Sequence, residues 1–245
     1  MTDVTFRVFR GHAGSGGLRD YTVPLSEGMV VLDAIHHIQA TQANDMAVCW
    51  NCKAGKCGSC SAEVNGKPRL MCMTRMDMLD MDKPITVEPM RRFPVIKDLV
   101  TDVSWNYARN KTIRPFKPKA READGTYRMM QFDIDRIQEF HKCIECFLCQ
   151  DVCHVMRDQQ QSEFVGPRFL IRVASLAMHP LDTDNRLRQL KDAFGIGYCN
   201  ITKCCTEVCP EHIKITDNAI IPLKERVVDR FYDPVKRLFR VFTGG

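Results

Sequence analysis

The sequence predicts an α+β protein, in which a small grasp-like sheet wrapped on one helix is followed by an all-α part. Three observations support this class. Alternating apolar residues, typical of strands, occur in the first hundred residues, and helical periodicity dominates the remainder. Thirteen cysteines fall into three groups separated by long cysteine-free stretches. The polar, proline-dotted stretch 114–128 has the composition of a loop. We therefore expect two domains, residues 1–105 and residues 106–245.

The N-terminal part is expected to contain four or so strands and one helix. VTFRVFRG (4–11) alternates as a strand does, and YTVPL (21–25) is its expected hairpin partner. MVVLDAIHHIQATQ (29–42) places Val30, Val31, Ala34, Ile35 and Ile38 on one face of a helix. SAEVNGKPRLMC (61–72) predicts two strands joined by a turn at Asn65–Gly66, and ITVEPM (85–90) predicts a further strand.

The C-terminal part is expected to be helical, with its cysteines at the turns. Helical periodicity is clear in RFLIRVASLAMHP (168–180), TDNRLRQLKDAFG (183–195) and DNAIIPLKERVVDRF (217–231). Pro180 and Gly195 stand at the expected helix ends.

Composition indicates a soluble, intracellular protein that uses its thiols for metal. The formal net charge is +5 and the basic residues are scattered, so no nucleic-acid partner is expected. The first residues, MTDVTFRVFRGHAG, lack the apolar stretch of a secretory signal, and no apolar run reaches the ~18 residues of a membrane span. In a reducing compartment an odd number of cysteines favours metal binding over a disulfide framework.

The first cysteine group predicts a [2Fe–2S] cluster. Cys52, Cys57, Cys60 and Cys72 give C-x4-C-x2-C with a fourth cysteine twelve residues on, which is the plant-type ferredoxin spacing. Gly55 and Gly58 would let the loop turn tightly and bring N–H groups near the cluster. Zinc is the alternative, because Cys49-x2-Cys52 and Cys57-x2-Cys60 resemble two halves of a zinc knuckle. On the cluster interpretation Cys49 is spare, and we expect it to be a small buried residue.

The second and third groups interlock as two runs of a bacterial dicluster pattern. Cys143, Cys146, Cys149 and Cys153 give C-x2-C-x2-C-x3-C, in which the fourth cysteine serves the other cluster. The same template laid backwards from Cys209-Pro210 meets Cys205, then Thr202 where a cysteine should stand, then Cys199. The alternative is a zinc site shared by the two groups.

The template assigns ligands to two further clusters. A [4Fe–4S] cluster would be bound by Cys143, Cys146, Cys149 and Cys209. Cys153, Cys199 and Cys205 supply only three thiolates, which favours a [3Fe–4S] cluster. Cys204 is out of register, so its thiol is expected to point elsewhere.

No side chains form a convincing catalytic set. The seven histidines show no partner pattern, and GHAGSGGLRD (11–20) has the glycines of a nucleotide loop but no apolar helix after it. A chain with three different clusters and no substrate site of its own is expected to carry electrons between two partners.

The chain resembles the iron–sulfur subunit of succinate dehydrogenase and quinol:fumarate reductase. The resemblance rests on the three cysteine groups in order, on FPVIKDLVTDVSWNYARNKTIRPF (93–116), and on FVGPRFLIRVASLAMHPLDTDNRLRQLKDAFG (164–195). It implies a plant-ferredoxin-like β-grasp domain followed by an all-α bacterial-ferredoxin-like domain. It also implies a flavoprotein partner with covalent FAD at the [2Fe–2S] end, and a membrane anchor serving quinone at the [3Fe–4S] end.

The same resemblance implies electron flow from succinate to quinone, with a quinol:fumarate reductase running in the opposite direction as the alternative. It places the chain peripherally, on the cytoplasmic face of a bacterial inner membrane. The C-terminal LKERVVDRFYDPVKRLFRVF (223–242) is both basic and apolar, so it is either an ordinary surface helix or an edge facing the membrane or the flavoprotein.

Three positions depart from the pattern of many family members. Those members have a proline after the Cys153 position, a tryptophan four residues further on, and a histidine after the Cys199 position, and these line a quinone pocket. Here the residues are His154, Asp158 and Asn200. Because an aspartate lacks an indole face and N–H, we expect an anchor that carries haem or another redox centre. The alternatives are that other residues form the same pocket, and that His154 is a plain solvated histidine.

Overall fold

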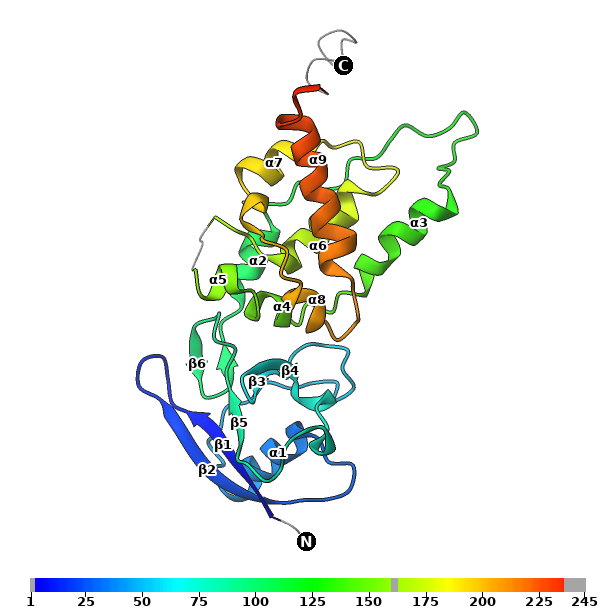
Figure 1. The fold of residues 1–245 in the computed structure, drawn as a ribbon. Coiled ribbons are helices and arrows are strands. Elements are labelled where there is room, and N and C mark those ends of the chain that lie inside the picture. The colour runs from blue at the N-terminus through cyan, green and yellow to red at the C-terminus, as the bar shows by residue number, and fades with distance from the viewer. Residues whose placement is uncertain (1–2, 160–162, 236–245) are drawn as a thin grey trace. The chain divides into compact units, whose positions relative to one another are not determined.

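The structure, a computed structural model, describes residues 3–159 and 163–235 and divides into two compact units (Figure 1). The first unit contains the chain up to Trp105 together with Ile144–Val152 and Val208–Glu211. The second contains Asn106–Cys143, Cys153–Glu207 and the chain from His212 onward. Two short cysteine-bearing segments from the second half of the sequence therefore belong to the first unit.

The first unit is built on a mixed five-stranded sheet with the strand order β2-β1-β5-β3-β4. The strands are β1 (Asp3–Arg10), β2 (Gly17–Pro24), β3 (Ser61–Val64), β4 (Lys67–Leu70) and β5 (Ile85–Glu88). β1 runs antiparallel to β2 and parallel to β5, while β3 runs antiparallel to both β4 and β5. Every strand that the alternation predicts is present, and the turn at Asn65–Gly66 has both residues at positive φ.

One helix covers this sheet. α1 (Val31–Thr41) buries Val31, Ala34, Ile35 and Ile38, as its apolar spacing predicts, whereas Val30 precedes the helix. The Asp33 carboxylate accepts the Val30 N–H at 3.2 Å and satisfies one of the donors left open at the helix start. Smaller elements follow the sheet: η1 (Met71–Met73), η2 (Met76–Met78), and the pair β6 (Val95–Lys97) and β7 (Val100–Thr101).

Helices make up the remainder of the described chain. They are α2 (Ser104–Asn110), α3 (Gln131–Gln138), η3 (Glu139–Lys142), α4 (Leu148–Asp151), α5 (His154–Arg157), α6 (Pro167–Ala177), α7 (Leu187–Asp192), η4 (Ile196–Tyr198), α8 (Cys204–Glu207), η5 (Ile215–Ile220) and α9 (Ile221–Phe231). η5 is a π-helical turn that runs directly into α9. None of the helices in this described part is both long and apolar enough to cross a membrane.

The helix expected over 183–195 is shorter than predicted, and α7 begins at Leu187. The cause is local side-chain bonding. The side-chain oxygen of Asn185 accepts the Leu187 N–H at 3.1 Å, and the Asp182 carboxylate accepts the Asp184 N–H at 3.1 Å. Short polar side chains that bond the backbone in this way favour turns over helix interiors.

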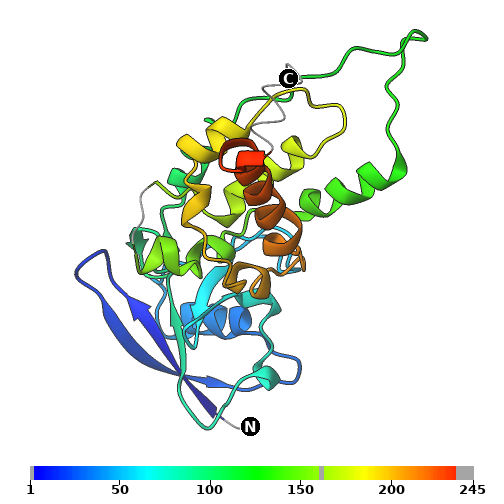
Figure 2. The same cartoon turned by 45° about the horizontal axis from the view of Figure 1, so that its top comes forward.

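A buried ion pair fastens the start of the proline-dotted loop. Arg186 and Asp182 are each 1% exposed at their side chains and lie 2.6 Å apart. The Arg186 guanidinium also donates to the carbonyl oxygens of Arg114 and Pro115, at 2.6 and 3.0 Å. Lys117 N–H donates to Asp182 at 3.1 Å. Beyond these contacts the chain runs on to α3 without a helix or strand (Figure 2).

Candidate iron–sulfur sites

The first cysteine loop turns its backbone N–H groups toward sulfur. The N–H groups of Ala54 and Lys56 donate to the Cys52 sulfur at 3.4 and 3.3 Å, and the Cys52 N–H donates to the Cys57 sulfur at 3.5 Å. Lys53 has a φ of 55°, which turns the chain tightly enough for these contacts. Such donors stabilise negative charge on the sulfurs, as a cluster requires.

Gly58 is required by a close approach as well as by its conformation. Its φ is 71°, and a Cβ there would lie 2.6 Å from the Cys146 Cα. The Ser61 hydroxyl donates to the carbonyl oxygens of Gly58 and Cys146, at 2.8 and 2.9 Å. Within the first unit, the first cysteine loop therefore lies directly against the first part of the second cysteine run.

The electrostatics of this loop differ from one thiol to the next. Burial opposes ionisation of Cys57, but hydrogen bonds from Cys52 and Ser59 lower its pKa to about 6. Burial raises the pKa of Cys60 to about 12, and the neighbouring Cys72 contributes to the same shift. Interactions among the predicted ligands contribute to both shifts, which indicates that the fold brings these cysteines together.

Cys49 is exposed, so the expectation that it is a small buried residue is wrong. It precedes Trp50, whose ring is 48% exposed and meets the His36 ring edge-on at 4.8 Å. The Lys53 ammonium lies 4.8 Å from the same ring. The chain at Cys49 therefore lies on the surface, where Trp50 packs against His36 and Lys53 instead of entering the core.

The residues of the predicted [4Fe–4S] set are distributed over several segments. The first unit contains Cys146, Cys149 and Cys209. The second unit contains Cys143, the last residue of its segment Asn106–Cys143. Cys146 and Cys149 are buried, and the chain after them is fixed by Asp151, whose carboxylate accepts the Arg92 N–H at 2.9 Å.

The two cysteine runs repeat the same backbone conformation. In the second run the residues two and four positions after Cys143, Glu145 and Phe147, have φ of 56° and 60°. In the third run the residues two and four positions after Cys199, Ile201 and Lys203, have φ of 62° and 64°. The short helices α4 and α8 begin at the same offset in each run. This repeat puts Thr202 at the position that Cys146 occupies in the other run.

The three thiols of the predicted [3Fe–4S] set line one cavity of the second unit. Cys153 lies just before α5, Cys199 lies just after η4, and Cys205 is in α8. Cys204 lines the same cavity. The π-helical turn η5 contributes Thr216, whose hydroxyl oxygen lies 3.4 Å from the Cys205 sulfur. π-helical turns often occur at functional sites, and this one places a polar group beside a buried thiol.

Burial makes two of these thiols, those of Cys153 and Cys205, poor acids when no cluster is bound. It raises the pKa of Cys153 to about 12, and the charges of Cys204 and Cys205 add to the shift. It raises the pKa of Cys205 to about 11, against the hydrogen bond from Thr216. Binding of iron would have to displace their protons, as metal binding to cysteine generally does.

The expectation that the Cys204 thiol points away is wrong. Cys204 lines the cavity, and its sulfur accepts a hydrogen bond from the Thr202 hydroxyl at 3.4 Å. The template places Cys204 where the other run has Leu148, so register alone predicts a different direction. The hydrogen bond from the Thr202 hydroxyl accompanies this direction of the sulfur.

His154 is half-buried and hydrogen-bonded, so it is not a plain solvated histidine. Its Nε2 lies 2.8 Å from the Asn200 amide nitrogen, and its Nδ1 lies 3.5 Å from the Thr202 hydroxyl. All three residues line the cavity, whereas Asp158 does not. Two of the three departures from the family pattern therefore lie at the cysteine cavity and contact each other.

Across residues 3–159 and 163–235, no group of three or more His, Cys, Asp or Glu side chains is placed to hold a single metal ion. A cluster makes a different demand. It contains several irons, so its cysteines surround a larger object instead of converging on one point. The lining of the cavity by cysteines from separate elements fits this demand.

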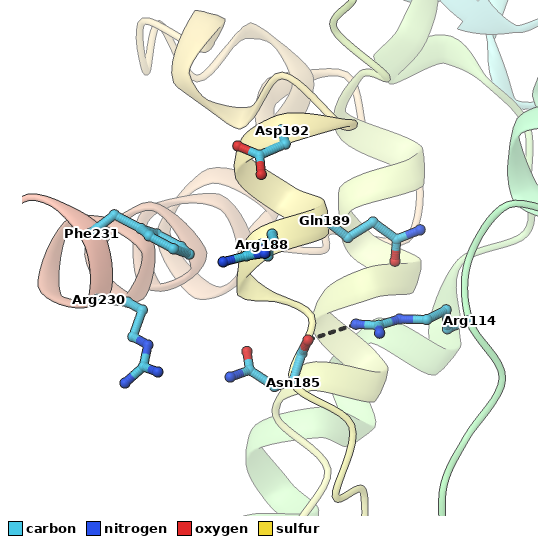
Figure 3. Close-up of a pocket in the computed structure, with 7 residues that line it drawn as sticks. All are labelled: Arg114, Asn185, Arg188, Gln189, Asp192, Arg230 and Phe231. Atoms are coloured by element: carbon cyan, nitrogen blue, oxygen red, sulfur yellow. Dashed lines mark hydrogen bonds between the residues drawn. The ribbon is translucent and has the colours of Figure 1, made fainter. Parts of the chain in front are cut away.

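A hollow of about 660 Å³ lies between Arg114 at the start of the proline-dotted loop, α7 and α9 (Figure 3). The sequence pattern does not predict it. Its basic lining comes from Arg114, Arg188 and Arg230, and the Arg114 guanidinium donates to the Asn185 carbonyl oxygen at 2.6 Å. These arginines are far apart in the sequence, so only the fold shows that they share a surface.

Comparison with known families covers both halves of the chain. A 2Fe-2S iron-sulfur cluster binding domain matches residues 5–107, and a 4Fe-4S dicluster domain matches residues 139–213. These matches agree with the mixed sheet followed by helices, and they bear out the expected fold class.

Individual relatives match over most of this chain. The fumarate reductase iron-sulfur subunit of Mycobacterium tuberculosis is 33% identical, over 79% of this chain and 79% of that protein. The succinate dehydrogenase iron-sulfur subunit of Bacillus subtilis is 30% identical, over 80% and 81%. An uncharacterized iron-sulfur protein of Methanococcus maripaludis is 32% identical over 89% of this chain, which spans only 43% of that protein's length.

A chain of the Mycobacterium smegmatis Sdh1 complex in the apo form has a similar structure. It is 62% identical, with a TM-score of 0.91, and the match covers 95% of this chain and 98% of that one.

Proposed function

The chain belongs to the electron-transfer iron–sulfur subunits of succinate dehydrogenase and fumarate reductase, and on this premise we propose that it passes electrons singly between a flavoprotein and a membrane anchor serving quinone. Succinate oxidation releases two electrons together, whereas each cluster carries one. The clusters supply the redox chemistry when bound, and the protein supplies their position and surroundings.

The proposed ligands follow the cysteine template. Cys52, Cys57, Cys60 and Cys72 hold [2Fe–2S] in a domain of residues 1–105. In the domain of residues 106–245, Cys143, Cys146, Cys149 and Cys209 hold [4Fe–4S], and Cys153, Cys199 and Cys205 hold [3Fe–4S]. The observation that carries the proposal is the cavity lined by the last three. Cys153 is 46 and 52 positions from Cys199 and Cys205, and the convergence of the three cysteines on one cavity supports a shared cofactor.

The order of the clusters is supported by contacts between the loops. Gly58 and Ser61 of the [2Fe–2S] loop contact the backbone of Cys146, which puts protein atoms of the first and second sites in direct contact. Cys149 and Cys153 are joined by three residues, as are Cys205 and Cys209, so each run links the second site covalently to the third. Electrons would travel from [2Fe–2S] through [4Fe–4S] to [3Fe–4S].

The flavoprotein, with its FAD, would face the [2Fe–2S] loop. Exposed apolar side chains lie at this loop: Trp50 is 48% exposed and Met73 is 55% exposed. Met73 also covers Gly55, the glycine between the first two ligands. Large exposed apolar side chains of this kind mark interaction surfaces, and aromatic and methionine residues are enriched in them.

The membrane anchor would face the three-cysteine cavity. His154 and Asn200 stand there in place of the proline and histidine found in many relatives, which supports an anchor with haem or another redox centre of its own. We place the chain peripherally, on the cytoplasmic face of a bacterial inner membrane. In 223–242, Leu223 and Val227 of α9 are buried as in an ordinary surface helix, and 236–242 lie outside the described residues.

Electron paramagnetic resonance during a redox titration of the whole complex tests this function. A three-iron signal in the oxidised complex, lost on mild reduction, together with signals of the other two clusters, supports it. Colourless protein that contains zinc instead of iron and acid-labile sulfide would refute it. The cluster potentials from the same titration decide between succinate oxidation and fumarate reduction, the activity named for the Mycobacterium tuberculosis relative.

A further inference from the structure

In the third cysteine run, the position where a ligand is missing has a thiol beside it. Thr202 stands where Cys146 stands in the other run, as the matching left-handed residues show. A neutral hydroxyl is a poor substitute for a thiolate on iron. The Cys204 sulfur, however, lies 3.4 Å from the Thr202 hydroxyl oxygen, so a sulfur reaches the neighbourhood where the template lacks one.

Cys204 also faces the same space as the other ligands. It lines the cavity together with Cys153, Cys199 and Cys205, so four thiols surround this cavity, one more than a three-iron cluster needs. No other ligand set uses Cys204.

From this arrangement we propose that Cys204 is a reserve ligand, with which the site of Cys153, Cys199 and Cys205 takes up a fourth iron from Fe²⁺ in solution. The proposal rests on the proposed function, since it requires a [3Fe–4S] cluster at these three cysteines. The position of Thr202 explains why Cys204 is held in reserve, because the hydroxyl donates to its sulfur until iron displaces that contact.

The uptake step balances without an added oxidant. One electron, from succinate through the complex or from dithionite, first reduces the [3Fe–4S] core to zero net charge. Fe²⁺ then enters, an Fe–S bond forms to Cys204, and the thiol proton goes to solvent. The product is a [4Fe–4S] core of charge 2+, so no further electron moves. Because the reduction potential depends on cluster type, uptake would change the last step of electron transfer.

The test uses the intact complex in three forms: wild type, Cys204→Ser, and Cys49→Ser as a matched control. Cys49 is an exposed cysteine that belongs to none of the proposed ligand sets. Each complex is reduced anaerobically with dithionite, given ⁵⁷Fe²⁺ alone, freed of unbound iron and reoxidised mildly. The three-iron resonance is measured before and after, and ⁵⁷Fe in four-iron clusters is measured by Mössbauer spectroscopy.

Wild type and Cys49→Ser should lose the three-iron resonance at least fivefold and gain about one ⁵⁷Fe per complex. Cys204→Ser should keep the resonance and gain none, and Cys204→Ala should behave in the same way. Equal uptake by wild type and Cys204→Ser would overturn the proposal, as would a wild-type resonance that added iron leaves unchanged. Absence of a three-iron resonance from all forms before iron is added would instead overturn the underlying ligand assignment.

Discussion

The Thr202 hydroxyl donates a hydrogen bond to the Cys204 sulfur at 3.4 Å, at the place where the repeat of the two cysteine runs requires a ligand. This contact links the two unusual residues of the third run. Thr202 removes one ligand, which leaves three thiolates for the last cluster. Cys204 puts a fourth sulfur at the edge of the same cavity. The identity of the last cluster therefore depends on these two side chains.

Replacing Thr202 with cysteine should convert the last cluster into a stable [4Fe–4S] cluster, because the new thiol stands in register with Cys146. The three-iron resonance of the oxidised complex should fall at least tenfold. The matched control is Thr206→Cys, which adds a thiol on α8 outside the template positions. A Thr202→Cys complex with an undiminished three-iron resonance would show that the register is wrong.

Gly58→Ala should destabilise the [2Fe–2S] loop more than Gly66→Ala does. Both glycines have nearly the same φ, 71° and 73°, so each alanine adds about 1–2 kcal/mol of backbone strain. Only at Gly58 does the new Cβ meet backbone, 2.6 Å from the Cys146 Cα, which adds about 1–3 kcal/mol of overpacking. Thermal loss of the [2Fe–2S] signal from the complex measures the difference. Equal losses for the two variants would contradict the close packing of the two loops.

Arg186→Met should destabilise the helical unit by about 3–5 kcal/mol, because it removes the cation that is paired with the buried Asp182 carboxylate. Arg188→Met, two residues along on an exposed position, should change stability by less than about 0.5 kcal/mol. Urea unfolding of the purified subunit, followed by circular dichroism, gives both values. A cost for Arg186→Met as small as that for Arg188→Met would contradict the role of the ion pair.

The stability of Arg186→Met should also depend on pH in a different way from that of the wild type. Burial tends to raise the pKa of Asp182, but in the wild type hydrogen bonds from Arg186 and the backbone hold it below its usual value. The stability that Asp182 contributes is thus present above about pH 4 and is lost only below it. Without Arg186, burial is opposed only by the N–H groups of Asp184 and Lys117, so the pKa of Asp182 is higher than in the wild type and the stability lost with Arg186 grows as pH rises. The gap between wild type and Arg186→Met should therefore be smaller at pH 5.5 than at pH 7.5, and a constant gap would argue against this cause.

Trp50→Ala should weaken association with the flavoprotein while leaving the clusters in place. Loss of a central aromatic contact costs about 2 kcal/mol or more, which corresponds to about thirtyfold in the dissociation constant. Val228→Ala is the control, since Val228 is half-exposed on α9 of the other unit. Binding of the flavoprotein to each variant, measured with cluster content, checks this. Unchanged affinity for Trp50→Ala would remove Trp50 from the interface.

Much of the fold follows from local patterns. The strands and α1 were predictable because their apolar residues alternate or recur with one helical face, and tertiary packing agrees with that local preference. The start of α7 was not predictable, because the side chains of Asp182 and Asn185 accept hydrogen bonds from nearby backbone N–H groups and so favour a turn over a helix. The arginine-lined hollow was not predictable either, since its residues come together only when the chain folds.

The cysteine sites show the same division. Spacing predicts which thiols belong to one template, because ligands on a short loop must reach one cluster. Spacing cannot predict the direction of Cys204, whose sulfur accepts a hydrogen bond from the Thr202 hydroxyl in the folded chain. Nor can it predict that Cys49 is exposed, because that depends on how Trp50 packs against His36.

The most direct test of the account is an iron, sulfide and zinc analysis combined with a redox titration of the intact complex, followed by electron paramagnetic resonance. The proposed ligand sets predict nine irons and ten acid-labile sulfides in this chain, about the sum for [2Fe–2S], [4Fe–4S] and [3Fe–4S] clusters. They also predict three separate one-electron signals, one of them a three-iron resonance that disappears on mild reduction. A chain with stoichiometric zinc, or with fewer than three cluster signals, would contradict the account.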